Sequence, residues 1–459
     1  MWCKRKPETI IKAVISAGAD LENPIKMDLL RYSTTDLFWS LVHSTTGFNT
    51  SEKIDDLTNH VVLSAISRTM SSDVLSGLES KYSDIHSGFC YDLIFNWIYG
   101  EDKNSFRNIA DYVAGNLSLL DRFNSFEIKD LLETDVLPVI DEVILSKLMY
   151  TITNRTMDSD SVIRIVEKRR TSAWYEDYTY FYEGIYQVAL MNQFYESHLN
   201  SFHHVEAKEM WNAYTSDYYQ MDTYYRDFHI AFSTCLQTLH PSLDDSFKDL
   251  AVYVEKEYKN WYLDQLASNW NNVIEADLKE TGRFKGIPQQ IDFYQDVVKK
   301  VDGKVFVIIS DAMRYDVAHS LAKQLEIETK ADVDISSQQG IYPTITKYGM
   351  AALLPHKILE AVENNGTTKV LVDGHSSEMS DRDGILKSYS ENSLALKHKD
   401  VMSMKRDDRR AAVKGKDIIY IYHDTIDASS HNDENSVFDA CDKAISEIKN
   451  LVNVICNEL

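Results

Sequence analysis

The stretch that decides the fold is Lys304–Asp316, which reads KVFVIISDAMRYD. Its apolar, largely β-branched run is continuous, and such a run is typical of a β-strand that is buried on both faces. Helical spacing of apolar residues follows from Arg314 to Leu325. A buried strand that leads directly into a helix is the first half of a βαβ unit, so the sequence predicts a parallel sheet here.

Two more stretches repeat this pattern towards the C-terminus. Lys369–Val372 is a second strand candidate, and the run IIYIY at 418–422 is another buried strand. An amphipathic helix is expected from Ser436 to Cys456. Strands that alternate with helices predict a mostly parallel sheet with helices on both faces for residues 286–459. Ligands bind such sheets beyond the carboxyl ends of the strands.

Residues 1–285 have a different pattern, in which apolar residues recur three and four positions apart. This spacing predicts helices, for example at Asp36–Thr45, Ile54–Thr69, Tyr91–Ile98 and Leu131–Met149. The expected fold class is therefore α + α/β, with an all-helical region at 1–285 and an α/β domain at 286–459. The boundary is placed in the segment 281–288, which holds two glycines and a proline.

The composition agrees with a largely helical, globular protein. Only 16 glycines and 7 prolines occur in 459 residues, against usual frequencies of about 7% and 5%. The formal net charge of −23 disfavours sequence-independent binding to DNA or to an anionic membrane, because the field repels phosphates. Five cysteines without a CxxC motif predict free thiols in the reducing cytoplasm. No apolar run reaches the ~18 residues of a membrane span.

An aromatic-rich stretch runs from Trp174 to Tyr225. It could form a platform on which bases or a partner helix stack, or it could be the core between packed helices. We favour core packing, because large rings are the usual filling between helices.

Two polar residues stand at the ends of predicted elements, one after a strand and one at the start of a helix. Asp311 comes directly after the first strand, where it could hold a metal or cap the next helix. Thr346 begins the apolar stretch TKYGMAALLP. A hydroxyl there faces unpaired backbone N–H groups, an environment that binds phosphate and favours an alkoxide nucleophile, although an ordinary threonine cap has the same pattern. No GxGxxG or Walker A motif follows any strand, so nothing supports a dinucleotide or P-loop site.

Two histidines and two aspartates lie within nine residues after the last strand. They are His423, Asp424, Asp427 and His431. Histidine and aspartate together are ligands for zinc or manganese. Asp427 and His431 are four residues apart and could share one face of a helical turn. With Asp311 and Thr346, this cluster indicates metal-assisted chemistry.

The order of these motifs resembles the PglZ family, in particular the type A PglZ phosphatases of BREX phage-defence systems, within the alkaline phosphatase superfamily. The similar stretches are VFVIISDAMRYD, YPTITKYGMAALLP and IIYIYHDTID, and the likeness extends from about residue 30 onward. It implies a phosphohydrolase with two divalent metal ions, for which zinc is expected and manganese or magnesium are alternatives. Its implied partners are a phosphate ester and other defence proteins. Nucleic acid remains possible within the complex, and no membrane is expected.

The resemblance also implies a role for individual residues. Thr346 is the nucleophile, Asp311 and Asp427 are metal ligands, and His431 is a further ligand. Arg314, His423 and Asp424 are candidates for binding phosphate or for orienting the ligands. Ser430 and His431 depart from the family pattern, in which a small residue, glycine and aspartate usually follow IDA.

One part of the superfamily site is absent from this sequence. The site also needs an Asp-His pair, usually in an Asp-His-Gly turn, and no Asp-His-Gly occurs in the chain. We therefore expect an internal piece of a longer protein with an incomplete alkaline-phosphatase-like domain. On this hypothesis the chain binds metal weakly and has little or no phosphatase activity.

Three functions remain open. The leading one is a metal-dependent phosphatase or phosphodiesterase in phage defence, and the alternative is a catalytically inactive scaffold of the defence complex. The third, a nuclease, is supported only by a basic cluster between residues 405 and 416, which is more typical of a solvated helix face.

Overall fold

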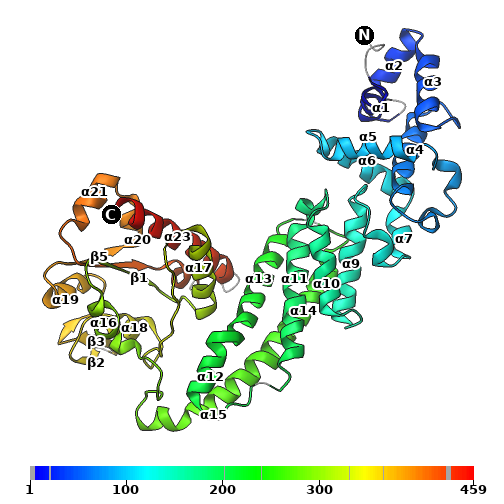
Figure 1. Cartoon of the computed structure of the whole chain (residues 1–459). Coiled ribbons are helices and arrows are strands. Elements are labelled where there is room, and N and C mark those ends of the chain that lie inside the picture. Colours follow the sequence, from blue (N-terminus) through cyan, green and yellow to red (C-terminus); the bar gives the residue numbers. More distant parts are fainter. Residues whose placement is uncertain are drawn as a thin grey trace. The chain divides into compact units, whose positions relative to one another are not determined.

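The computed structural model describes residues 6–19, 22–200, 202–238, 240–329, 331–364, 366–430 and 436–459. The chain divides into two compact units (Figure 1). Unit 1 comprises Met1–Gln193 with Thr234–Val254, and unit 2 comprises Phe194–Ser233 with Glu255–Leu459. Each unit is described by itself, and a domain boundary at residue 286 stays a prediction.

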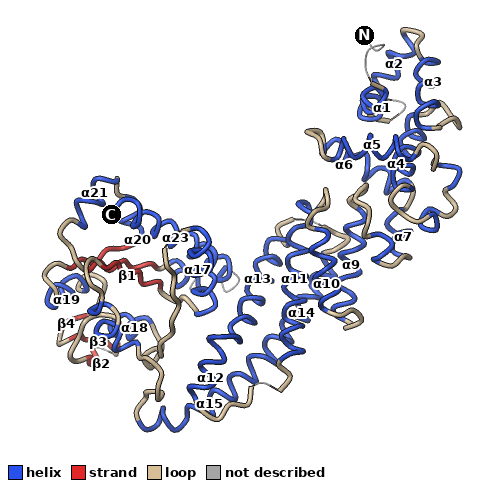
Figure 2. The backbone as a smooth tube through the Cα atoms, in the orientation of Figure 1, coloured by secondary structure: helices blue, strands red, loops and turns tan. Residues whose placement is uncertain are grey.

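Among its described residues, unit 1 contains helices joined by loops and no strand (Figure 2). Its helices are α1 (Pro7–Ser16), α2 (Pro24–Arg31), α3 (Thr35–Thr46), α4 (Ile54–Ser67), α5 (Ser87–Ile98), α6 (Lys103–Asn116), α7 (Leu119–Asn124), α8 (Ile128–Leu131), α9 (Val139–Thr153), α10 (Ser159–Arg169), most of α11 (Tyr175–Ser197) and nearly all of α14 (Asp244–Glu255). The predicted helices at Asp36–Thr45, Ile54–Thr69 and Tyr91–Ile98 correspond to α3, α4 and α5. No described helix is long and apolar enough to cross a membrane.

The helix predicted at Leu131–Met149 is wrong in its first half. α8 ends at Leu131 and α9 begins only at Val139, directly after Pro138. Proline has no backbone N–H to donate to the preceding turn and tends to start a helix, so a single helix does not continue through Pro138.

The aromatic stretch contributes core side chains to unit 1. Trp174, Tyr178, Phe181 and Tyr182 are buried, and the Trp174 indole donates to the carbonyl of Asp135 at 2.7 Å. Rings in these positions have no face free for stacking bases. In this half of the stretch the structure therefore agrees with the core-packing interpretation.

Unit 2 begins with helices α12 (Ala207–Ala213), most of α13 (Tyr219–Cys235) and α15 (Asp264–Glu280). Two π-helical stretches, η4 (Tyr214–Tyr218) and η5 (Lys256–Leu263), interrupt the regular helix. Both supply a tyrosine to the buried carboxylate of Asp222, which accepts from Tyr214 at 2.7 Å and from Tyr258 at 2.6 Å. These bonds satisfy a carboxylate that would otherwise be costly to bury.

The main sheet of unit 2 is parallel and has the order β1–β6–β5. Its strands are β1 (Val305–Ser310), β5 (Ser393–Lys397) and β6 (Ile418–His423). The two strands predicted from continuous apolar runs are thus confirmed as neighbours, with Val305 opposite Ile418 and Ser310 opposite His423. The remaining helices of unit 2 are α16 (Phe293–Asp296), α17 (Tyr315–Glu328), α18 (Thr346–Ala352), α19 (Arg382–Tyr389), α20 (His398–Ser403), α21 (Arg406–Val413), α22 (Thr425–Ser430) and α23 (Val437–Glu458).

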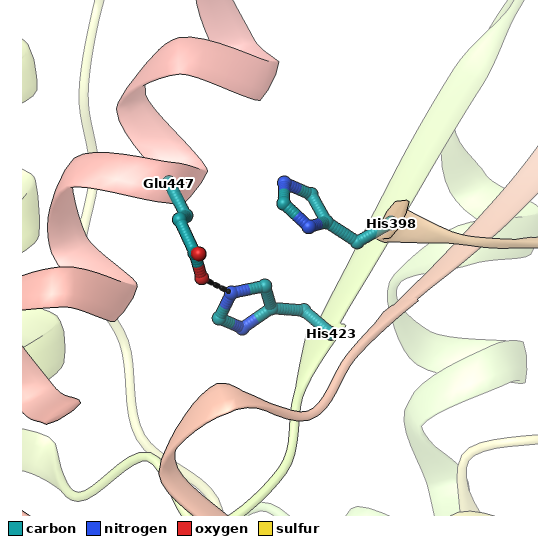
Figure 3. Close-up of side chains that lie close together, drawn as sticks. All are labelled: His398, His423 and Glu447. Carbon is teal, nitrogen blue, oxygen red and sulfur yellow. Dashed lines mark hydrogen bonds and ion pairs between the residues drawn. The ribbon is translucent and has the colours of Figure 1, made fainter. Parts of the chain in front are cut away.

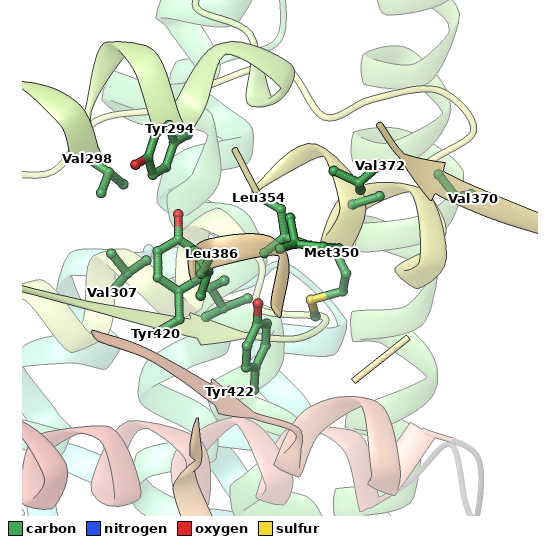
Figure 4. Packing of buried hydrophobic residues seen from close by; sticks show 13 residues of the cluster. Tyr294, Val298, Val307, Met350, Leu354, Val370, Val372, Leu386, Tyr420 and Tyr422 are labelled. Atoms are coloured by element: carbon green, nitrogen blue, oxygen red, sulfur yellow. The ribbon is translucent and has the colours of Figure 1, made fainter. Parts of the chain in front are cut away.

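Side chains alternate between the two faces of this sheet, and each face has its own core. One face presents Val307, Ile309, Tyr420 and Tyr422, which pack with Met350 of α18 and with other residues of the cluster in Figure 4. The opposite face presents Ile419 and Ile421. They pack with Val401 of α20, Val413 of α21 and Leu451 of α23.

A second, antiparallel sheet has the order β2–β3–β4. Its strands are β2 (Leu359–Asn364), β3 (Thr367–Val372) and β4 (His375–Ser376). The predicted strand at Lys369–Val372 therefore exists, but it pairs with β2 and β4 and does not join the parallel sheet. A short hairpin turn that includes Gly366, whose φ is 78°, pairs β3 with the preceding strand β2.

Candidate active site

A cavity of about 740 Å³ lies at the carboxyl end of β1. It is lined by residues from several separate segments, among them Asp311 directly after β1, Thr346 at the start of α18 and Asp427 in α22. The structure thus brings together three of the residues that the sequence predicted for one site. β1 and β6 are adjacent and parallel, so the segments that follow them emerge at the same edge of the sheet.

Asp311 is held in place by its backbone. Its N–H donates to the carbonyl of His423 at 2.9 Å, which continues the pairing of β1 with β6 by one residue. The next residue, Ala312, has a φ of 62°, a left-handed conformation that is strained for a residue with a Cβ. Such strain is concentrated at functional sites, where the surrounding structure maintains it. Here it turns the chain sharply out of the strand beside the cavity.

The electrostatics of the cavity favour a cation. Burial raises the pKa of the Asp311 carboxyl, and the nearby charge of Asp427 raises it further. A hydrogen bond with the Thr346 side chain acts in the opposite direction. A divalent ion bound beside Asp311 would favour its ionised form and offset the nearby charge of Asp427.

Two further polar residues line the same cavity, Lys347 and Gln290. The Lys347 ammonium donates to the carbonyl of Thr368 at 3.1 Å, and the Gln290 side chain accepts from the N–H of Ile341 at 3.0 Å. Neither was predicted as a site residue. Lys347 could have been noticed as the only cation beside Thr346 in the motif, whereas Gln290 is far away in sequence and carries no such signal.

Arg314 lines a neighbouring cleft rather than the cavity around Asp311. Its guanidinium Nε lies 3.2 Å from the Asp316 carboxylate. The cleft has a volume of about 620 Å³ and shares Met313, Gly340 and Thr344 with the cavity. Six aromatic residues contribute to its lining, namely Trp211, Tyr214, Trp270, Phe284, Tyr315 and Tyr342.

His423 and Asp424 do not line the cavity. His423 is buried on the other face of the sheet, where its Nδ1 lies 3.0 Å from the Ser310 hydroxyl and its Nε2 lies 2.8 Å from a Glu447 oxygen. Asp424 is exposed and pairs with Lys399 at 3.1 Å. His431, the third predicted metal ligand, lies outside the described residues.

The basic cluster between residues 405 and 416 is partly engaged in structural contacts. Arg409 donates to the Glu458 carboxylate at 2.6 and 3.0 Å, and Arg410 donates to the Glu458 carbonyl at 2.8 Å. These contacts attach α21 to the end of α23. They favour the interpretation of a helix face with structural ion pairs over a nucleic-acid surface.

Comparison with known proteins gives matches for the C-terminal part and for the whole chain. Residues 293–459 match the model of the family described as the BREX system PglZ alkaline phosphatase-like domain. The chain is 31% identical to the Bacillus cereus "Alkaline phosphatase-like protein PglZ" over 98% of its own length and 52% of that protein. It is 29% identical to the Escherichia coli "Alkaline phosphatase-like protein BrxZ" over 96% of its length and 52% of that protein. The chain therefore spans about half the length of these relatives, and no solved structure matches it.

Proposed function

Since residues 293–459 belong to the PglZ family of BREX alkaline phosphatase-like domains, we propose that the chain supplies the nucleophile and the metal-binding carboxylates of a phosphohydrolase in a BREX phage-defence system. The observation that carries this proposal is the meeting of Asp311, Thr346 and Asp427 in one cavity. A hydroxyl between two carboxylates is the donor set for phosphoryl transfer assisted by metal ions.

The residues fit divalent metal ions on chemical grounds. Asp311 and Asp427 supply carboxylate oxygens and Thr346 supplies a hydroxyl oxygen, which together suit manganese and magnesium as well as zinc. Burial and the charge of Asp427 raise the pKa of Asp311, and a bound divalent ion would favour its ionised form. We propose two ions, as in the alkaline phosphatase superfamily, with zinc as the expected metal.

In the proposed reaction the Thr346 oxygen attacks phosphorus and the alcohol or phenol leaves on the opposite side. Asp311 lines the same cavity as Thr346 and would hold an ion beside its hydroxyl, which would then lose its proton to water more readily. The Lys347 ammonium adds positive charge beside the phosphate. When bound, the metal ions stabilise the charge that develops on the phosphoryl oxygens. Water then releases phosphate from Thr346 and restores the hydroxyl.

The adjoining aromatic cleft supports a bulky substituent on the phosphate ester. Because the cleft shares residues with the cavity, a group attached to a phosphate at Thr346 would extend into it. Trp211 and Trp270 provide flat apolar surfaces there, which favour ring systems over small alcohols. We therefore propose a phosphate ester with an aromatic or heterocyclic leaving group.

The alternative function is a catalytically inactive scaffold within the same defence complex. The helical unit 1 offers extended surface for partners, and the carboxylates at the cavity would then have no ion to bind. The two functions differ in their metal content, because only the enzyme requires stoichiometric metal.

Manganese binding by the full chain tests the proposal. Asp311→Asn and Asp427→Asn are each expected to weaken manganese binding by more than about tenfold, because each removes a charged ligand. The matched control is Glu360→Gln, which removes an exposed carboxylate of β2 and should leave the affinity unchanged. Equilibrium dialysis measures all three. Manganese that binds equally well to both Asp variants would contradict the metal site, and a chain that binds no divalent metal would support the scaffold.

A further inference from the structure

A second group of metal-type ligands lies in unit 2, on the sheet face opposite to the proposed active site. His398 is the first residue of α20 and directly follows β5, His423 ends β6, and Glu447 lies on α23 (Figure 3). One ligand atom from each residue lies within 4.8 Å of the others. Three elements that are distant in sequence thus place two imidazoles and a carboxylate at one point.

The register of the sheet separates this group from Asp311. Ser310 and His423 are paired residues in β1 and β6, and their side chains meet on the face that carries Ile419 and Ile421. Ile309 and Tyr422 point to the other face, towards α18 and the cavity. The two sites therefore use different side chains of the same strands.

The group is largely withdrawn from water. His423 is 2% exposed and His398 is 8% exposed. The Nε2 atom of His398 is buried and has no hydrogen-bond partner among the described residues. A buried polar atom without a partner is costly and calls for an explanation. A bound ion in this group would supply one, because either imidazole nitrogen can act as its ligand.

Neighbouring hydroxyls orient the other two residues as metal ligands require. The Ser310 oxygen lies 3.0 Å from His423 Nδ1, which leaves Nε2 directed at Glu447. The Thr425 hydroxyl donates to the Glu447 carboxylate at 2.5 Å. Metal-binding histidines commonly use their second nitrogen in such a bond, and metal-binding carboxylates are hydrogen-bonded as well.

We propose that His398, His423 and Glu447 form a divalent metal site of the zinc type, with water as the fourth ligand. Two nitrogens and one carboxylate oxygen are a ligand set that zinc accepts, at bond lengths of about 2.0–2.2 Å. The three donor atoms lie within 4.8 Å of one another. Rotation of the side chains would bring them to the distances that such bonds require. For Nε2 to bind the ion, the proton of a neutral His423 would lie on Nδ1, where it would donate to Ser310.

The ion in this site would join the carboxyl ends of β5 and β6 to α23. The same strand end leads through Asp424 into α22 and Asp427. A metal ion in this site would therefore stabilise the end of β6, from which the chain continues to Asp427. The proposal does not depend on the phosphohydrolase, because none of its three ligands lines the Asp311 cavity; only the supporting Ser310 is shared.

Zinc binding in an Asp311→Asn/Asp427→Asn background tests the site alone. The full chain with these two substitutions is expected to bind one zinc ion, and X-ray absorption at the zinc edge is expected to show two imidazole ligands. Adding His398→Gln or Glu447→Gln should weaken zinc binding by more than about tenfold. Adding His375→Gln, which replaces an exposed histidine of β4, is the matched control and should have no effect.

Two outcomes would overturn the proposal. One is a double-aspartate variant that binds no zinc, or binds it without imidazole ligands. The other is equal zinc affinity in the His398→Gln and Glu447→Gln variants. The absorption measurement needs no substitution within the group, so it remains decisive even if those variants do not fold.

Discussion

Thr346→Ala is expected to lower metal-dependent phosphoryl transfer by at least about 10³-fold, as removal of a catalytic nucleophile does in other enzymes. The reason is local. Thr346 lines the same cavity as Asp311 and Asp427, and among these three only its hydroxyl can be the nucleophile in the proposed mechanism. Hydrolysis of an aryl phosphate monoester and of a diester, with zinc or manganese added, measures the effect.

A second readout follows the covalent step directly. After the protein without substitutions is incubated with the ester, mass spectrometry is expected to find phosphothreonine at residue 346. This readout is the more sensitive one, since the sequence contains no Asp-His-Gly turn and its turnover is expected to be low. Thr346→Ser keeps a hydroxyl and should retain part of the transfer. Equal hydrolysis by unchanged chain and Thr346→Ala would contradict the assigned nucleophile.

Asp316→Ala is expected to destabilise unit 2 locally by about 3–5 kcal/mol, the cost of removing one partner from a buried ion pair. The Asp316 side chain is fully buried and is paired with the Arg226 guanidinium, which is itself 2% exposed. Arg226 also donates to Ser320 at 2.9 Å. Without Asp316, the guanidinium stays in a site that water does not reach and keeps only Ser320 and the partly exposed Asp227 as partners, so its desolvation is poorly compensated.

Hydrogen exchange in α13 and α17 is the appropriate measurement, because a chain with two compact units is not expected to unfold in one step. Exchange of these amides should accelerate strongly in Asp316→Ala. The control is Asp227→Ala, which also removes a carboxylate close to Arg226, at 3.2 Å, but one whose side chain is 36% exposed. Its effect should be at most about 1 kcal/mol.

The same variant connects stability with the proposed site. Asp316 lies on the first turn of α17, five residues after Asp311. If α17 is destabilised, the turn at Ala312 that positions Asp311 is no longer fixed. Manganese binding at Asp311 should therefore weaken as well. An Asp316→Ala protein with unchanged exchange in α13 and α17 would show that this ion pair does not hold the two helices together.

The sequence patterns were most informative for elements whose own residues indicate how they are buried. The continuous apolar runs of β1 and β6 predict strands that are buried on both faces, and parallel strands place their following residues at one edge. The approach of Asp311 to Asp427 follows from this rule. Thr346 followed only from the helix start and from the family motif, because no rule of strand order brings α18 to that edge.

Elements whose position depends on a partner were less predictable. β5 was not predicted, because SLALK at 393–397 is short and has only three apolar residues. The strand at Lys369–Val372 was predicted, but its pairing was not, although Asn365-Gly366 is a strong hairpin signal. The group of His398, His423 and Glu447 had no pattern at all, since its three members come from α20, β6 and α23.

The sequence by itself determined the helical first region, the buried parallel strands and the family-type residues at their ends, because these depend on local periodicity and on short motifs. Only the tertiary structure decided which face each side chain occupies. His423 follows Tyr422 by one residue, and the two-residue period of a strand sends it away from Asp311 and towards Glu447. That choice of face depends on strand pairing, which brings together residues that no stretch of the sequence contains side by side.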